Sequence, residues 1–159
     1  MKVQYVSPFA EAAVSVFTTL INVTPERGQL AARPQLFTTQ QVNIVCGITG
    51  DVEGLVIYGM SMNTSLKIAS KMIGMPVTQF DQLVASAIGE LGNMVTGNSA
   101  SLLAGQGFNC DITPPTILRG TNVKITTVDI PALVIPLNLK DVGTFEVNVS
   151  LQERRKMAA

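Results

Sequence analysis

The sequence predicts an α+β fold with a mostly antiparallel sheet and helices packed on one face. Strand-like segments come in runs instead of alternating with helices, which favours antiparallel pairing. The chain has 159 residues, of which 47% are hydrophobic, so one domain can bury roughly two-thirds of its surface. We therefore expect a single domain over residues 1–159, in which about residues 152–159 form a frayed, charged tail.

The first part of the chain predicts one helix and then three strands. Ser7 suits the N-cap and Pro8 the first helical position, and apolar residues recur at spacings of three and four up to about Val23. Pro34 interrupts the first strand and favours an edge position for it. The other two strands flank a turn at residues 50–54 and predict an antiparallel hairpin. The three predicted strands are residues 30–39, 41–49 and 55–60.

Two helices follow, and then three or four strands. Asn63 or Thr64 caps a short helix that runs to Ile73, where a glycine and a proline end it. A longer helix begins at Asp81 and runs to about residue 104. The predicted strands after it are residues 110–118, 122–130, 132–139 and 144–151. The coarse order of elements along the chain hints at a duplicated unit, in which one helix is followed by strands.

The composition excludes several kinds of catalyst. Histidine is absent, so a Ser-His-Asp or Cys-His mechanism is impossible, and no histidine can bind a metal or sense pH. No cluster of metal-ligating residues stands out, so we expect no metal site in this chain. Cys46 and Cys110 lie far apart and form no CxxC motif, which favours two buried thiols in a reducing compartment over the alternative of one disulfide.

Charge and hydropathy narrow the range of partners. The 11 basic residues balance the 11 acidic ones, which argues against nucleic-acid binding through a basic face. There is no apolar run of roughly eighteen residues and no signal peptide, so we expect a cytoplasmic protein without a membrane span. Charged residues make up 14% of the chain, against about 25% in typical domains, which suggests that a partner or a second copy covers part of the surface.

The predicted long helix has two faces. The spacing i, i+4, i+7 and i+11 gives a buried stripe at Val84, Ile88, Leu91 and Val95. The same spacing recurs about 200° around the helix, facing away from the core, at Ser86, Glu90, Asn93 and Gly97. Three internal glycines, Gly89, Gly92 and Gly97, each cost about 0.5–1 kcal/mol relative to alanine. Either they pack on a neighbouring strand and Glu90 and Asn93 are ordinary solvent residues, or they admit a partner's backbone.

Two segments resemble the CheC/CheX/FliY family of chemotaxis phosphatases. Gly89-Glu90-Leu91-Gly92-Asn93, followed by Gly97-Asn98-Ser99-Ala100, is similar to the family's signature helix, which carries Glu-x-x-Asn among glycines. The N-terminal run from Ser7 to Phe17 is similar to the opening helix of CheX proteins. The element order also matches, so the resemblance covers nearly the whole chain and implies a CheC-like fold.

Some positions depart from the family pattern. CheC-type members often carry a second Glu-x-x-Asn in the other half of the chain, but here Glu11 is followed by Val14 where the asparagine would stand. The resemblance therefore implies one site, which is the CheX arrangement. CheC proteins also have a proline a little over twenty residues after the motif asparagine, and Pro114 and Pro115 fall near that place with a different spacing.

The resemblance implies a phosphatase that acts on the aspartyl phosphate of a CheY-type response regulator, in chemotaxis or a related two-component pathway. It implies that Asn93 positions the attacking water, a role that suits an amide because it both donates and accepts hydrogen bonds. Glu90 would pair with the regulator's lysine, and Ser86, Gly89 and Gly97 would contact the partner. The regulator would bring its own Mg²⁺, so the chain itself needs no cofactor. CheX proteins pair through their sheets, so a homodimer is expected.

The main alternative is a non-catalytic interaction module that binds a response regulator or a flagellar-switch component. Related flagellar-switch domains share the fold without this chemistry, so the fold alone gives no activity. A sensory or ligand-binding domain is a third class, and the lack of a polar, aromatic-lined pocket signal counts against it. The intact pair of Glu90 and Asn93 favours the enzyme.

Overall fold

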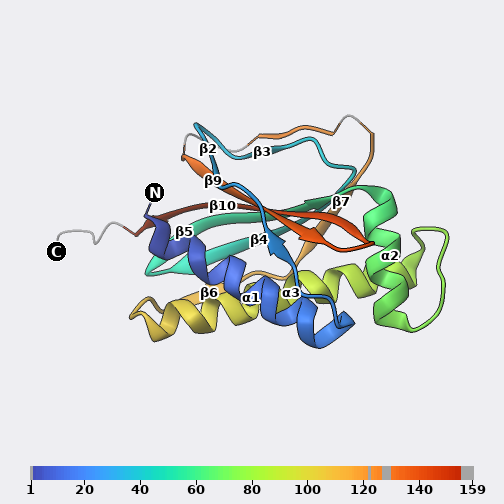
Figure 1. Cartoon of the computed structure of the whole chain (residues 1–159). Helices are drawn as coiled ribbons and strands as arrows, with labels where there is room; N and C mark the ends of the chain where they lie inside the picture. The colour runs from blue at the N-terminus through green and yellow to red at the C-terminus, as the bar shows by residue number, and fades with distance from the viewer. Residues whose placement is uncertain (1, 122, 127–129, 155–159) are drawn as a thin grey trace.

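The computed structural model describes residues 2–121, 123–126 and 130–154 and confirms the predicted α+β class (Figure 1). An antiparallel sheet is covered on one face by α1 (Val3–Ile21) and α3 (Gln82–Gly105), which pack against each other (Figure 1). α2 (Met62–Ile73) stands at one end of the sheet. The predicted order of one helix, strands, two helices and strands holds.

The long strands form two hairpins that meet at the centre of the sheet. One consists of β4 (Val42–Gly50) and β5 (Val52–Met60), and the other of β9 (Ala132–Leu139) and β10 (Gly143–Glu153). β5 pairs with β10, so the strand order is β1-β9-β10-β5-β4-β6. Each hairpin comes after a long helix, which matches the outline of a repeated unit in the sequence.

Short strands extend the edges of this sheet and form a second, smaller ladder. β1 and β2 pair with β9, β6 and β7 pair with β4, and β3 pairs with β8. Their bounds are β1 (Glu26–Arg27), β2 (Ala31–Arg33), β3 (Phe37–Thr38), β6 (Cys110–Ile112), β7 (Thr116–Arg119) and β8 (Ile125–Thr126).

Prolines break two of the predicted strands. The strand predicted over residues 30–39 splits into β2 and β3 on either side of Pro34. The strand predicted over residues 110–118 splits into β6 and β7 around Pro114 and Pro115. Proline has no backbone N–H to donate to a ladder, so pairing stops where it stands. β1 is not among the predicted strands. Its two residues are a strand through their pairing with β9, which the local sequence does not indicate.

The C-terminal strands also differ from the prediction. Of the strand predicted over residues 122–130, only β8 is seen, and residues 122 and 127–129 lie outside the described residues. β10 continues through Glu153, opposite Val52, so Gln152 and Glu153 belong to the sheet and not to a tail. Residues 155–159 lie outside the described residues. Pairing likewise shortens the first hairpin turn, since β5 already begins at Val52.

α1 begins earlier than predicted. Its first residue is Val3, so Ser7 is not the N-cap and Pro8 lies inside the helix. The ring of Tyr5 meets Phe108 edge-on, with 5.4 Å between centroids, and the Tyr5 hydroxyl donates to the carboxylate of Glu153, the last residue of β10. These tertiary contacts stabilise a first turn that the local sequence does not signal.

The caps of the other two helices follow the rules for capping side chains. Ser61, and not Asn63 or Thr64, caps α2: its hydroxyl accepts the backbone N–H of Thr64 at 3.1 Å. Gly74 ends that helix with φ +84°, as predicted. α3 begins after Asp81, again as predicted.

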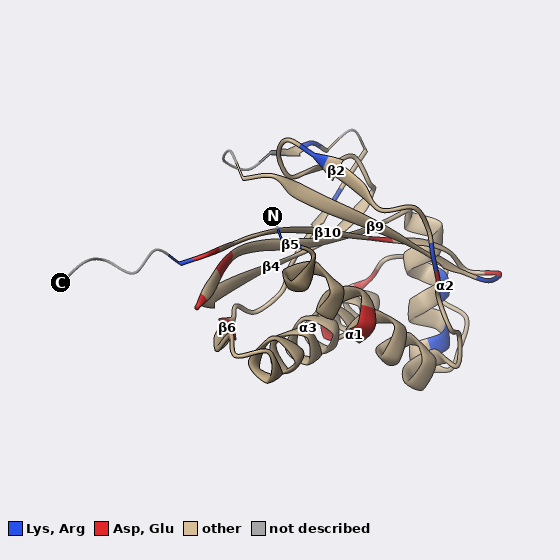
Figure 2. Ribbon diagram, turned by 60° about the vertical axis from the view of Figure 1, so that its left-hand side comes forward, with Lys and Arg blue, Asp and Glu red and all other residues tan. Residues whose placement is uncertain are grey.

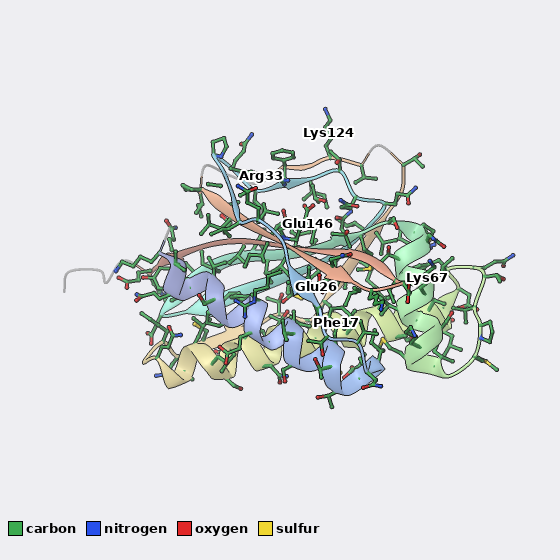
Figure 3. All side chains as sticks on the ribbon, in the orientation of Figure 1. Phe17, Glu26, Arg33, Lys67, Lys124 and Glu146 are labelled. Atoms are coloured by element: carbon green, nitrogen blue, oxygen red, sulfur yellow. The ribbon has the colours of Figure 1, made fainter. Side chains whose placement is uncertain are left out.

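The main core lies between the helices and the sheet. Phe145 of β10 meets Phe17 of α1 edge-on, with centroids 4.9 Å apart, and stacks on Tyr58 of β5 at 5.4 Å. All three side chains are fully buried, and Figure 3 shows Phe17 pointing from α1 toward the sheet. This packing decides which face of each helix stays exposed.

A smaller layer covers the face of the sheet away from the helices (Figure 1). Its apolar centre is formed by Leu36, Ile57 and Ala132. Arg33 lies 3.7 Å from the Glu146 carboxylate and donates to Asn148 Oδ1 at 3.3 Å; Figure 3 shows Arg33 above Glu146. α1 and α3 occupy one face, as predicted, and the segment from β2 to β3 packs on the other.

Both cysteines are free thiols. Cys46 is buried, and that burial raises the pKa of its thiol. Cys110 is only half-buried, so the prediction of two buried thiols holds for Cys46 alone.

Charged side chains are sparse over α1 and α3 (Figure 2). Within the 24 residues of α3, Glu90 is the only charged one. Among the residues that the structure describes, no helix combines the length and the apolar character needed to cross a membrane.

Candidate active site

α3 presents the predicted site on its exposed face. The helix starts where Asp81 Oδ1 accepts the backbone N–H of Val84 at 2.9 Å. Its inner stripe is fully buried, as predicted, at Val84, Ile88, Leu91 and Val95. The opposite side of the helix therefore faces solvent, and Ser86, Glu90 and Asn93 are exposed there.

Gly92 allows α3 to lie close to the sheet. A Cβ at this position would come within 2.5 Å of Ile44 Cγ2 on β4, so no larger residue fits without a shift. One turn later, the buried Thr96 hydroxyl donates to the Gly92 C=O at 2.7 Å and lies 2.8 Å from the Tyr58 hydroxyl. These contacts fix the height and rotation of the turn that carries Asn93.

Gly89 and Gly97 have more room. The nearest atom to a Cβ on Gly89 would be Ile117 Cδ1 at 3.8 Å, and for Gly97 it would be Ile112 Cδ1 at 3.9 Å. Both are ordinary van der Waals distances, so the fold itself would accept alanine at either position. Packing on a neighbouring strand thus explains Gly92 alone, and close approach of a partner stays a prediction for the other two.

A shallow groove of about 510 Å³ runs along this face of α3. Its helical side is lined by Ser86, Gly89, Glu90 and Asn93. Its other side is lined by Ile112 and residues 113–115, the segment between β6 and β7. Of the five predicted site residues, the structure brings four together in the groove, and Gly97 is not part of its lining.

The second side of the groove is not evident from the sequence. The only signal for residues 113–115 is the approximate spacing of Pro114 and Pro115 after Asn93. Strand pairing of β6 and β7 with β4 carries the segment alongside α3, where Pro115 Cγ would lie 4.0 Å from a Cβ on Gly89. That placement depends on partners far away in the sequence.

Glu90 and Asn93 can act together on one ligand. At i and i+3 they project from the same side of the helix, about 4.5 Å apart along its axis. Within the described part of the chain, neither side chain forms a hydrogen bond or ion pair with another residue, and no group of three or more His, Cys, Asp or Glu could hold a metal. The carboxylate and the amide are therefore available to water or to groups of a bound partner.

Fold and site together define a class of protein: an α+β domain of CheC-like fold that displays a carboxylate and an amide on an exposed helix. Residues 42–138 match the family described as chemotaxis phosphatase CheX. The CheY-P phosphatase CheX of Thermotoga maritima is 36% identical over 142 residues, which cover 87% of this chain and 91% of that relative. The chain belongs to the CheX family of chemotaxis phosphatases, which confirms the resemblance seen in the sequence.

Solved structures confirm the CheC-like fold. A CheC-like superfamily protein from Shewanella sp. PV-4 matches with a TM-score of 0.86 and 25% identity, covering 96% of this chain and 99% of that one. The CheX–CheY–BeF3–Mg²⁺ complex from Borrelia burgdorferi matches with a TM-score of 0.81 and 34% identity, covering 94% and 98%.

Proposed function

We propose that this chain is a phosphatase that hydrolyses the aspartyl phosphate of a CheY-type response regulator. The observation that carries the proposal is the exposed pair of Glu90 and Asn93, one turn apart along the groove, in a chain of this family. The relative from T. maritima is named a CheY-P phosphatase, and the structure from B. burgdorferi is a complex of CheX with CheY, BeF3 and Mg²⁺. Both support a CheY-type partner for this chain.

In this proposal Asn93 orients the attacking water. Its amide accepts one hydrogen bond from the water and can donate another, which holds the water in line with the phosphorus. The water oxygen bonds to phosphorus while the bond from phosphorus to the aspartate oxygen breaks. The products are a free carboxylate and inorganic phosphate, which keeps both protons of the water. A hundredfold acceleration requires about 2.7 kcal/mol, which positioning can supply.

Glu90 has a docking role in the same proposal. Glu90 is the only charged residue of α3. Its carboxylate pairs with the regulator's lysine and so positions the helix against the phosphorylated aspartate. The regulator supplies the Mg²⁺ that neutralises the phosphoryl oxygens. Ser86 and Gly89 line the approach, and Gly97 lets the next turn of the helix come close to the partner.

The direct test is phosphate release from a regulator charged with acetyl phosphate, with wild type, Asn93→Ala or Asn98→Ala. Asn98 is a matched control, because it is an exposed asparagine of α3 outside the lining of the groove. We expect Asn93→Ala to lower the rate at least about tenfold, since it removes the group that orients water. Its Kd for the regulator should stay within about twofold, and Asn98→Ala should match wild type.

The results separate the proposal from its alternatives. An equal loss of binding and turnover in Asn93→Ala would contradict the water-positioning role. No acceleration by wild type, together with binding to the regulator, would favour a non-catalytic interaction module, which the same fold can also support.

We further propose that the chain forms a homodimer paired through its sheet. Leu30 lies directly before β2 and Phe37 lies on β3, in the layer on the face away from α1 and α3 (Figure 1). Their side chains are 46% and 37% exposed. Only 14% of the residues are charged, which favours a surface that is partly covered, and a second copy would remove these apolar side chains from water.

A further inference from the structure

The edge strand next to β4 contains one extra residue beside the groove. The pairs of β4 with β6 and with β7 leave two residues of β4, Cys46 and Gly47, opposite the three residues 113–115. Three residues opposite two make a β-bulge, a feature that bends a strand and redirects its side chains. Two of the three are prolines, which have no N–H to donate to β4. Thr113 is therefore the residue that can hold this segment in place.

Thr113 binds Gly47 with both its backbone and its side chain. Its N–H donates to the Gly47 C=O at 3.0 Å, and its hydroxyl accepts the Gly47 N–H at 2.7 Å. A Cβ on Gly47 would lie 2.9 Å from Thr113 Cγ2, so the threonine side chain packs directly on the backbone of Gly47. The hydroxyl oxygen thus replaces the strand C=O that a regular ladder would offer to Gly47.

The segment held in this way faces the catalytic pair across the groove. Residues 113–115 line one side, and Glu90 and Asn93 line the other. Pro115 lies beside α3 at Gly89, directly before Glu90, where its Cγ would be 4.0 Å from a Cβ on that glycine. The position of the bulge therefore determines the width of the groove at the level of the two polar side chains.

We propose that Thr113 is a positioning residue of the phosphatase site. By fastening residues 113–115 to Gly47, it fixes the second wall of the groove into which the regulator's phosphorylated segment fits. The φ angles of two consecutive prolines are fixed, so this wall loses little conformational freedom when the partner binds. The inference rests on the proposed function, because it names a surface that the same partner must contact.

The test compares Thr113→Val with Thr113→Ser in steady-state dephosphorylation of the regulator. Valine keeps the shape but removes the acceptor of the Gly47 N–H, whereas serine keeps the hydroxyl. We expect Thr113→Val to raise KM roughly three- to tenfold, the range set by one hydrogen bond, and to change kcat by less than about twofold. Thr113→Ser should restore most of the affinity. Thr49→Val is the control, since Thr49 is exposed on β4 outside the lining of the groove.

Thermal unfolding of each variant shows whether it is folded. If Thr113→Val does not fold, the pair Pro114→Ala and Pro115→Ala, which keeps Thr113, tests the same wall and should also raise KM selectively. The inference would be overturned if the Thr113 and proline variants had the wild-type KM, or if Thr113→Ser had a KM as high as that of Thr113→Val. Neither result would affect the proposed phosphatase activity. A wild type that releases no phosphate would overturn the proposed function and this inference with it.

Discussion

Thr96 has one hydroxyl proton, and it already donates that proton to the Gly92 C=O at 2.7 Å. In the contact between Thr96 and Tyr58, which spans 2.8 Å, the tyrosine must therefore be the donor. Both side chains are fully buried, so the burial raises the pKa of Tyr58 far above its ordinary range and keeps the hydroxyl protonated. The direction of the chain from Tyr58 to Thr96 to Gly92 is thus fixed.

This direction predicts unequal costs for removing the two hydroxyls. Tyr58→Phe removes only a donor, and Thr96 keeps its bond to Gly92, so we expect a loss of about 1 kcal/mol in the free energy of unfolding. Thr96→Val leaves the buried Tyr58 hydroxyl without an acceptor and should lower the free energy of unfolding by more, about 1–3 kcal/mol. Urea unfolding of both variants measures the difference.

The double variant completes the cycle. Tyr58→Phe combined with Thr96→Val leaves no stranded hydroxyl, so its cost should be smaller than the sum of the two single losses. A loss for Tyr58→Phe as large as that for Thr96→Val would contradict the assigned order of the two hydrogen bonds, and strict additivity would contradict the contact between the two hydroxyls.

At the scale of the element, α3 contains glycines with two different purposes. Gly92 lies under the helix, where a Cβ would meet Ile44 Cγ2 at 2.5 Å, and Gly89 lies beside the groove, where the nearest atom would be 3.8 Å away. The same substitution should therefore have opposite effects on stability at two positions one turn apart.

We expect Gly92→Ala to lower the free energy of unfolding by about 1–3 kcal/mol, because the helix must move away from the sheet. Gly89→Ala should raise it by about 0.5–1 kcal/mol through better helix propensity. If a partner approaches this face closely, Gly89→Ala should nevertheless weaken binding of the regulator. Chemical unfolding and a binding titration on the same samples measure both effects.

The sign of the stability change is the decisive result for α3. Stabilisation by Gly92→Ala would contradict the close contact with β4. Wild-type regulator binding by Gly89→Ala would show that this glycine does not serve the approach of a partner.

At the scale of the molecule, the sheet is covered by helices on one side and by a thin layer on the other. The apolar side chains exposed on that layer predict self-association. We expect light scattering to give about twice the chain mass of 16.9 kDa, and Leu30→Lys to shift the mass toward one chain.

A second lysine variant controls for the added charge. Met75 is 57% exposed in the turn between α2 and α3, so Met75→Lys should leave the mass unchanged. A mass of one chain for the wild type, or an equal effect of both variants, would contradict pairing through this face.

The sequence by itself determined the fold class, the presence of the three helices and the polar face of α3. These depend on local periodicity and on caps, so Asp81 and the buried stripe from Val84 to Val95 could be located without any distant contact. Val3, by contrast, begins α1 because Tyr5 packs on Phe108, a partner about a hundred residues away in the chain that no local pattern reveals.

The same distinction applies to the site. Helical spacing brings Glu90 and Asn93, three residues apart, to one side of a helix. Their selection as site residues rests on the resemblance to the CheC/CheX/FliY family. Only the tertiary structure places residues 113–115 on the other side of the groove. Strand pairing with β4 and the hydrogen bonds between Thr113 and Gly47 hold them there. Periodicity is a property of neighbours in the chain, whereas a groove forms between elements that only the packed core brings together.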